Sequence, residues 1–195
     1  MRFTRFTLVV VLWIHTAAFC LSQVQISPLF TDHALIQQDR PITIWGSGPA
    51  DEIVTVSFQK ESKSTKVNSK GEWSIKFKAP ESGGPYILRM NDRVYQDIYV
   101  GDVWLAGGQS NMEWKMASSE GFKEEKVSNI PRIHYFKTPR VLHNKPQWDI
   151  TSGEWIVVDS SNLASVSGVA YFFSKEIFSE IDVPIGIIDH SWGGT

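Results

Sequence analysis

The chain has 195 residues, enough for one ordinary domain or two small ones. Hydrophobic residues make up 42% of it and charged residues 21%, which is typical of a soluble globular protein. The formal net charge of −2 argues against a general binder of nucleic acids or of anionic membranes. The eight tryptophans are many for this length; besides packing in a core, their rings suit stacking on sugars.

Residues 1–22 have the pattern of a secretory signal peptide. Two arginines precede an apolar run, Leu8–Ile14, and small residues follow it up to Ser22. The run is too short for a membrane span, so we expect export to the periplasm, the cell surface or the medium. Lipid attachment at Cys20 is an alternative that Phe19 disfavours. Cleavage after Ser22 removes the single cysteine, so no disulfide is expected.

The sequence over residues 24–99 is typical of an all-β module. Residues 53–58 alternate cleanly between apolar and polar side chains, which predicts a strand with one buried face. Strands at regular, short spacing suggest a small β-sandwich or a jelly-roll-like module. The expected strands cover residues 30–38 (irregular), 41–46, 53–58, 65–67, 73–78, 86–90 and 94–100, with a polar hairpin tip at 60–64.

The second half of the chain has the pattern of an α/β domain. An apolar strand over 100–106 ends at a glycine pair, and a helix begins within 111–116. Apolar residues at helical spacing predict a helix over 169–181, and the apolar run 185–189 is typical of a central parallel strand. Loops at the carboxyl ends of such strands carry the chemistry. Further expectations are a strand over 132–136, a long loop over 137–149, a short β segment over 153–158 and a helix start at 160–165.

Ser110 is the candidate nucleophile. A strand, a glycine turn and a serine at the start of a helix expose a hydroxyl beside free backbone N–H groups. These groups and the helix dipole can stabilise a developing oxyanion. The same pattern fits many inert turns. It does not match the Gly-x-Ser-x-Gly elbow of the α/β-hydrolases, because Met112 stands where the second glycine would be.

Two blocks of the sequence resemble a known family. The nucleophile block of the SGNH hydrolases, in their sialate O-acetylesterase-like branch, is similar to Gly108-Gln109-Ser110-Asn111-Met112. The strand and loop that carry the family's oxyanion glycine are similar to residues 184–195. The resemblance runs from about Gln25 onward. It implies an N-terminal β-sandwich module over 24–99, followed by the N-terminal part of a flavodoxin-like SGNH hydrolase domain over 100–195.

The resemblance implies a secreted carbohydrate O-acetylesterase that removes acetyl groups from O-acetylated sialic acid. Ser110 would be the nucleophile, and its backbone N–H would be one oxyanion donor. The N–H of Gly193, or else of Gly194, would be a second donor. Gln109 and Asn111 would orient the serine or contact the substrate. Acetylated xylan is an alternative substrate, and a glycan-binding β-sandwich with a vestigial hydrolase start is a non-catalytic alternative.

The chain departs from the family pattern in its later blocks. The family draws a third oxyanion donor from an asparagine or comparable polar group in a later block, and its general base is a histidine near the C-terminus, usually with an aspartate three residues before it. Both of these later blocks are absent from this sequence. His190, His134 and His143 do not stand at that position. We therefore expect a fragment with an incomplete hydrolase domain, which is a poor esterase and prone to aggregate. The sequence implies no metal, cofactor or partner protein.

Overall fold

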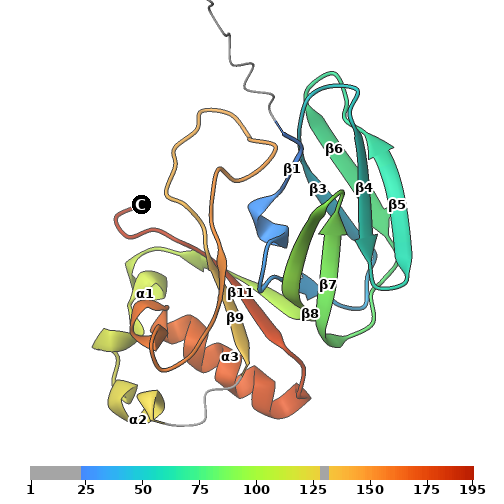
Figure 1. Cartoon of the computed structure of the whole chain (residues 1–195). Helices are drawn as coiled ribbons and strands as arrows, with labels where there is room; N and C mark the ends of the chain where they lie inside the picture. Colours follow the sequence, from blue (N-terminus) through green and yellow to red (C-terminus); the bar gives the residue numbers. More distant parts are fainter. Residues whose placement is uncertain (1–22, 128–131) are drawn as a thin grey trace, which may run out of the picture.

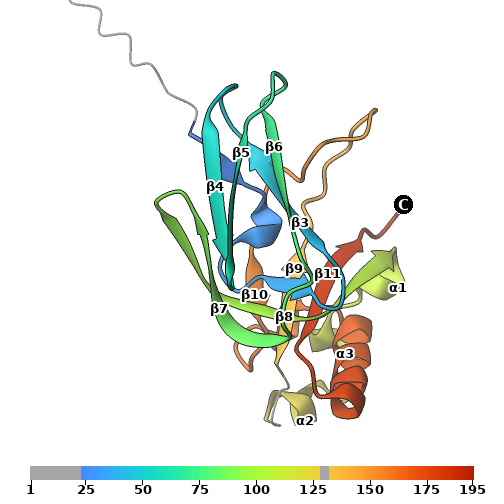
Figure 2. The same ribbon diagram turned by 90° about the vertical axis from the view of Figure 1, so that its right-hand side faces the viewer.

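The computed structural model describes residues 23–127 and 132–195. The predicted signal peptide lies outside the described residues. Strands from the first half of the chain form one end of the molecule, and the helix α3 lies at the other end (Figures 1 and 2). A long loop after β9 runs from the second half back towards β1 (Figure 1).

Most of the strands come before the first helix in the chain. Among the described residues, no helix has the length and apolar character needed to cross a bilayer. The strands are β1 Gln25–Ile26, β2 Leu35–Gln37, β3 Ile42–Ser47, β4 Ile53–Phe58, β5 Glu61–Lys66, β6 Glu72–Phe77, β7 Gly83–Met90, β8 Arg93–Gly108, β9 Ile133–Lys137, β10 Trp155–Val157 and β11 Ile185–Ser191. The helices are α1 Ser110–Glu113, α2 Phe122–Lys126 and α3 Gly168–Ile181, with 3₁₀ turns at Pro28–Phe30, Met116–Ser118 and Leu163–Ser165.

The strands form two sheets. β1, β3 and β6 make a three-stranded sheet, and the larger sheet has the order β10-β9-β11-β8-β7-β4-β5, with β2 also paired to β8. The sequence expectations for β4, α3 and the central strand β11 are confirmed; β11 is parallel to both β8 and β9. The chain is therefore rich in mixed sheet.

β8 belongs to both halves of the molecule. Residues 93–100 pair antiparallel with β7, and residues 102–108 pair in parallel with β11. Among the described residues, no strand pairs with the second edge of 102–108, where Leu105 is 70% exposed. The domain boundary predicted between residues 99 and 100 falls inside this strand, so the division into two domains stays a prediction.

Three of the expected elements are wrong in detail. The hairpin tip is only Gln59 and Lys60, because the polar residues after it form β5, an edge strand that needs no fully buried face. Residues 30–38 hold only one strand, the short β2, because a turn precedes it, in which the Ala34 N–H donates to the Thr31 carbonyl oxygen and His33 lies at φ 63°. The helix expected within 111–116 ends at Glu113, where the chain becomes extended.

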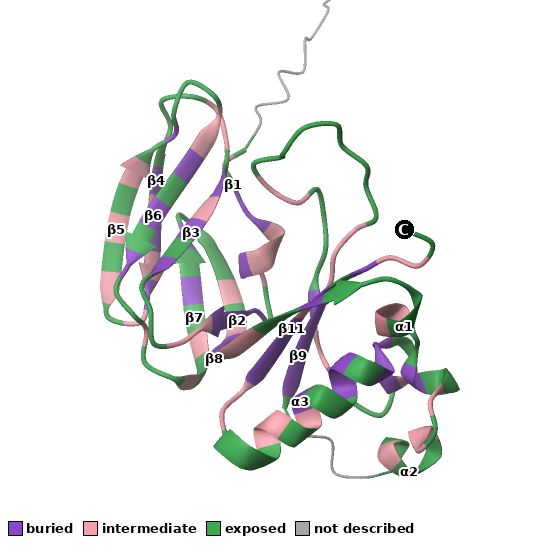
Figure 3. Ribbon diagram, turned by 180° about the vertical axis from the view of Figure 1, so that it is seen from behind, coloured by how far each residue is buried: buried purple, intermediate pink, exposed green. Residues whose placement is uncertain are grey.

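β9 and β11 are buried on both faces, as a parallel strand in the middle of a layered fold requires. Ile133 and Tyr135 pack in the cluster under α3, whereas Phe136 packs in the core of the first half. Figure 3 shows both strands buried, with the outer side of α3 exposed. The carboxyl ends of these strands are therefore held from two sides.

His134 occupies the junction between the two halves and is fully buried. Its Nδ1 donates to the His33 carbonyl oxygen at 2.6 Å, and its Nε2 has no partner among the described residues. Burial lowers the pKa of His134 below its ordinary value of 6.5. The hydrogen bond to His33 and the charge of Asp97 act in the opposite direction, but less. The folded protein therefore holds a neutral imidazole at this junction.

Acidification should destabilise the fold through His134. The unfolded chain takes up a proton near pH 6.5 and the folded chain does not, so the free energy of unfolding should fall as the pH drops from about 7 to about 5. We expect His134→Gln to show a shallower pH dependence than the wild type in urea unfolding. The control, His143→Gln in the exposed loop, should keep the wild-type slope. An unchanged slope in His134→Gln would contradict this assignment.

Candidate active site

Ser110 begins α1 directly after the end of β8. Gly108, at φ 145°, makes the turn, in a backbone conformation that residues with a side chain rarely adopt. Ser110 is exposed, and neither its hydroxyl nor its backbone N–H has an acceptor among the described residues. Because α1 has only four residues, the helix-dipole contribution expected from the sequence has little support. The feature of Ser110 that supports a nucleophilic role is therefore its exposed hydroxyl.

The structure brings Gly193 next to Ser110. β11 runs parallel to β8 and ends opposite Gly108, and the Trp192 N–H donates to the Gly108 carbonyl oxygen at 3.0 Å. A Cβ atom added to Gly193 would lie 3.7 Å from the Ser110 Cα and 3.8 Å from its Cβ. Two sequence blocks about 80 residues apart therefore meet at the carboxyl ends of adjacent parallel strands, where α/β folds place their sites.

The Gly193 N–H is already used as a donor. It donates to the Glu113 Oε2 atom at 2.8 Å, so an oxyanion at this position would have to displace a carboxylate. Gly194 lies at φ 86° and is exposed, and its N–H has no acceptor among the described residues. The assignment of the second oxyanion donor to Gly193 or Gly194 stays a prediction.

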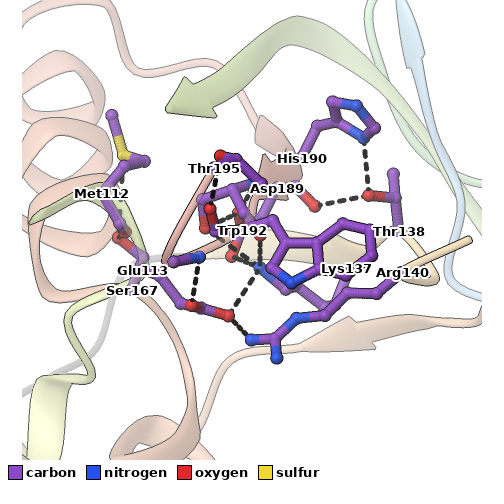
Figure 4. A network of polar contacts seen from close by, with 12 residues as sticks. Met112, Glu113, Lys137, Thr138, Arg140, Ser167, Asp189, His190, Trp192 and Thr195 are labelled. Atoms are coloured by element: carbon purple, nitrogen blue, oxygen red, sulfur yellow. Dashed lines mark hydrogen bonds and ion pairs between the residues drawn. The ribbon is translucent and has the colours of Figure 1, made fainter. Parts of the chain in front are cut away.

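Glu113 accepts the Gly193 N–H and lies beside two cations, Lys137 and Arg140 (Figure 4). Arg140 forms an ion pair with it, and the Lys137 Nζ lies 3.9 Å from its Oε1. The guanidinium of Arg140 also lies over the Trp192 ring, 5.9 Å from the centroid. Glu113 is thus held by a backbone N–H on one side and by positive charge on the other.

Asp189, at the end of β11, is the buried centre of the network behind this surface. Its Oδ1 accepts the backbone N–H of Ser191 at 2.8 Å and the Ser191 hydroxyl at 2.6 Å. Its Oδ2 accepts the Tyr135 hydroxyl and lies 2.9 Å from the Lys137 Nζ. Burial raises the pKa of Asp189, but the hydrogen bonds from Ser191, Tyr135 and Lys137 outweigh it and hold the pKa below its usual value. Asp189 is therefore a carboxylate.

Tyr135 and Ser167 extend the network to both helices beside the site. Burial, together with the hydrogen bond to Asp189, raises the pKa of Tyr135 far above its usual value, so it stays a neutral donor. The Tyr135 oxygen accepts the Ser167 N–H at 3.2 Å. The Ser167 hydroxyl donates to the Met112 carbonyl oxygen at 2.6 Å and accepts the Ala170 N–H, which caps α3. Hydrogen bonds thus connect the ends of β9 and β11 with α1 and with the start of α3.

A pocket of about 540 Å³ opens beside this network. Its wall includes Glu113, which contacts Gly193, so the pocket adjoins the surface next to Ser110. The pocket is lined by three cations and three carboxylates, and two of each are paired with one another. The remaining cation, Lys115, has no ion-pair partner among the described residues.

The other candidate residues do not join a catalytic group. Gln109 and Asn111 are exposed, and among the described residues neither side chain forms a hydrogen bond. None of the four described histidines contacts Ser110; His190, for example, bonds through Nδ1 to the Thr138 hydroxyl at 2.9 Å. Among the described residues, no cluster of histidine, cysteine and acidic side chains fits a metal ion. Thus no general base for Ser110 is found in this part of the chain.

Sequence reasoning missed most of the polar network. For Lys137 and Asp189, position in the sequence was the one indication of a role at the site, since both stand near the ends of predicted parallel strands. Residue type offered none, because charged residues at strand ends are common. Tyr135 and Ser167 gave no signal at all, since their roles depend on packing between elements far apart in the sequence.

The sequence of this chain is similar to those of known esterases. No family model matches the chain. Sialate O-acetylesterase from Mus musculus is 27% identical in an alignment that covers 85% of this chain, and the Homo sapiens protein of the same name is 24% identical over 84% of it. The chain is a homologue of sialate O-acetylesterases. This confirms the resemblance drawn from the two sequence blocks.

A solved structure supports the same relationship. The carbohydrate acetylesterase from Xanthomonas citri superposes with a TM-score of 0.83 and 36% identity over 88% of this chain. The homologues are longer: the chain spans 35% of the mouse protein, 36% of the human protein and 41% of the Xanthomonas citri chain.

Removing the charge of Asp189 should loosen the strand ends. In Asp189→Asn, an amide replaces a buried acceptor of several hydrogen bonds, so we expect a loss of about 1–3 kcal/mol in the free energy of unfolding. Urea unfolding measures it. The control is Asp51→Asn, which removes a pair with Lys66 in which the Asp51 side chain is 82% exposed; it should cost less than about 1 kcal/mol. Equal losses in the free energy of unfolding of the two variants would show that the buried network does not stabilise the fold more than an exposed ion pair does.

Proposed function

We propose that this chain carries the nucleophile part of the active site of a carbohydrate O-acetylesterase, with Ser110 as the nucleophile. The approach of Gly193 to Ser110 at the carboxyl ends of β8 and β11 is the observation that carries the proposal. The names of the homologues support the reaction class. We also propose export, and an SGNH hydrolase domain over residues 100–195 preceded by a β-sandwich module over 24–99.

The proposed reaction is acyl transfer to serine. The Ser110 Oγ attacks the acetyl carbonyl carbon and gives its proton to a base, while the carbonyl oxygen becomes an oxyanion. The Ser110 N–H and a glycine N–H of the 193–194 turn stabilise that oxyanion. The C–O bond to the sugar then breaks, the sugar oxygen takes a proton, and water hydrolyses the acetyl-serine to acetate. No described residue is assigned as that base.

O-acetylated sialic acid is the proposed substrate. The pocket beside Glu113 contains one unpaired cation, Lys115, together with Arg140 and Lys137 at its wall. Positive groups there suit a sugar that carries a carboxylate. The wall also carries the carboxylates of Glu113 and Asp189, which are held by Arg140 and Lys137, and that of Glu154. A neutral acetylated sugar such as acetylxylan is the comparison substrate.

Acetate release should depend on Ser110 and should be stimulated by imidazole. Because no described histidine contacts Ser110, dissolved imidazole can supply the missing base. We expect wild-type protein with imidazole to release acetate from O-acetylated sialic acid faster than from acetylxylan. Ser110→Ala under the same conditions should lose nearly all of the protein-dependent rate.

Ser69→Ala, in an exposed turn, is the matched control and should keep the wild-type rate. The rate in Ser110→Ala with imidazole measures the hydrolysis that imidazole catalyses alone. Equal rates for wild type and Ser110→Ala, with and without imidazole, would overturn the assignment of the nucleophile. A faster rate on acetylxylan would keep the nucleophile and replace the substrate.

A further inference from the structure

A second pocket lies where the loop after β9 meets the first-half strands. Its volume is about 320 Å³, within the range of roughly 300–1,000 Å³ of small-molecule sites. Trp45 of β3 and Trp148 of the loop both line it, and Trp148 is 49% exposed. We call it the Trp148 pocket. It is separate from the pocket beside Glu113, and only Thr138 lines both.

The loop wall of the Trp148 pocket is anchored to the first half of the chain. The Ser27 hydroxyl donates to the Asp149 Oδ1 at 2.7 Å, and the same oxygen accepts the Ile150 N–H at 2.8 Å. The Trp148 indole N–H donates to the Gly46 carbonyl oxygen at 3.4 Å. The contacts of Ser27 with Asp149 and of Trp148 with Gly46 connect residues more than 100 positions apart. They hold the indole in place before any ligand binds, which lowers the entropy cost of binding.

The lining has the chemistry of a site for a neutral sugar. The two indole rings provide apolar surfaces, and His143, Gln147 and His190 provide donors and acceptors. The pocket has no lysine or arginine in its lining, and its one carboxylate, Asp149, is used by Ser27 and Ile150. An anion finds no cation here, whereas a pyranose presents apolar faces and polar hydroxyls together.

The Trp148 pocket begins at the same strand ends as the candidate active site. The Thr138 hydroxyl donates to the Asp189 carbonyl oxygen at 3.1 Å and bonds to His190, which lines the Trp148 pocket. Asp189 in turn lines the pocket beside Glu113. A glycan that crosses the carboxyl ends of β9 and β11 passes from one pocket to the other.

We propose that the Trp148 pocket is a second carbohydrate subsite, which binds a neutral, non-acetylated pyranose of the same glycan whose acetyl group reaches Ser110. This rests on the proposed function for the link to catalysis, but the binding of a neutral sugar can be measured without it. Trp148 would act as a specificity-determining residue, because it selects glycans by a ring that does not react.

The test measures binding of unreactive sugars to the full chain. Lactose and xylobiose are titrated against wild type, Trp148→Ala, Trp148→Phe and Trp104→Ala, with ligand-observed NMR as the readout. We expect one of the two sugars to bind, Trp148→Ala to weaken that binding at least about tenfold, and Trp148→Phe to retain most of it. Trp104 is 42% exposed and lies outside the pocket, so Trp104→Ala should bind as the wild type does. Thermal unfolding checks that each variant is folded.

The outcomes separate this inference from the proposed function. No binding of either sugar, or equal weakening in Trp148→Ala and Trp104→Ala, overturns the subsite and leaves the Ser110 assignment intact. Trp148-dependent binding in a chain whose acetate release does not depend on Ser110 supports sugar binding in the Trp148 pocket and overturns the assignment of Ser110 as the nucleophile. With both activities present, Trp148→Ala should raise KM for an acetylated oligosaccharide and leave the rate on p-nitrophenyl acetate unchanged.

Discussion

The pairing of β8 with different partners along its length determines how the rest of the chain is placed. Its first part belongs to the antiparallel strands of the first half, and its second part carries the candidate nucleophile beside β11. Gly101 lies at the change of partner, where a Cβ atom would come within 2.0 Å of the Pro184 carbonyl oxygen. The close approach of β11 to β8 therefore requires glycine here. Because one strand serves both halves, displacing the first half would also move Ser110.

At the candidate site, Ser110 is exposed, whereas the Gly193 N–H beside it is occupied by Glu113. Asp189 is buried, and the cost of desolvating its charge is offset by Lys137 and by hydroxyl and backbone donors, which hold the strand ends together. Glu113 is bound to the Gly193 N–H, one of the two glycine N–H groups that are candidates for the second oxyanion donor. Its ion pair with Arg140 gives the carboxylate an alternative partner when that N–H turns to substrate.

The parts of the fold that follow from local pattern were predictable from the sequence. The alternation in 53–58, the helical spacing in 169–181 and the apolar run 185–189 each report a buried face, and all three elements are found. The pattern predicts a hairpin tip over 60–64 and a strand only over 65–67, whereas β5 begins at Glu61, because an edge strand buries little and needs no apolar pattern. Ser110 and Gly193 could be paired through resemblance, whereas the Asp189 network could not, since its hydrogen bonds join residues of four separate elements.

The one-sided pairing of residues 102–108 also affects how water reaches the backbone. In a parallel pair, alternate residues of a strand direct their N–H and C=O groups to the same neighbour. With β11 on one side and no strand on the other among the described residues, the amides that point away from β11 have no ladder partner, and that of Val103 donates instead to the Gln37 Oε1 atom at 2.9 Å. Amide hydrogen exchange after Val103 would then alternate between slow and fast residues, with the strand that delivers Ser110 protected on one side only.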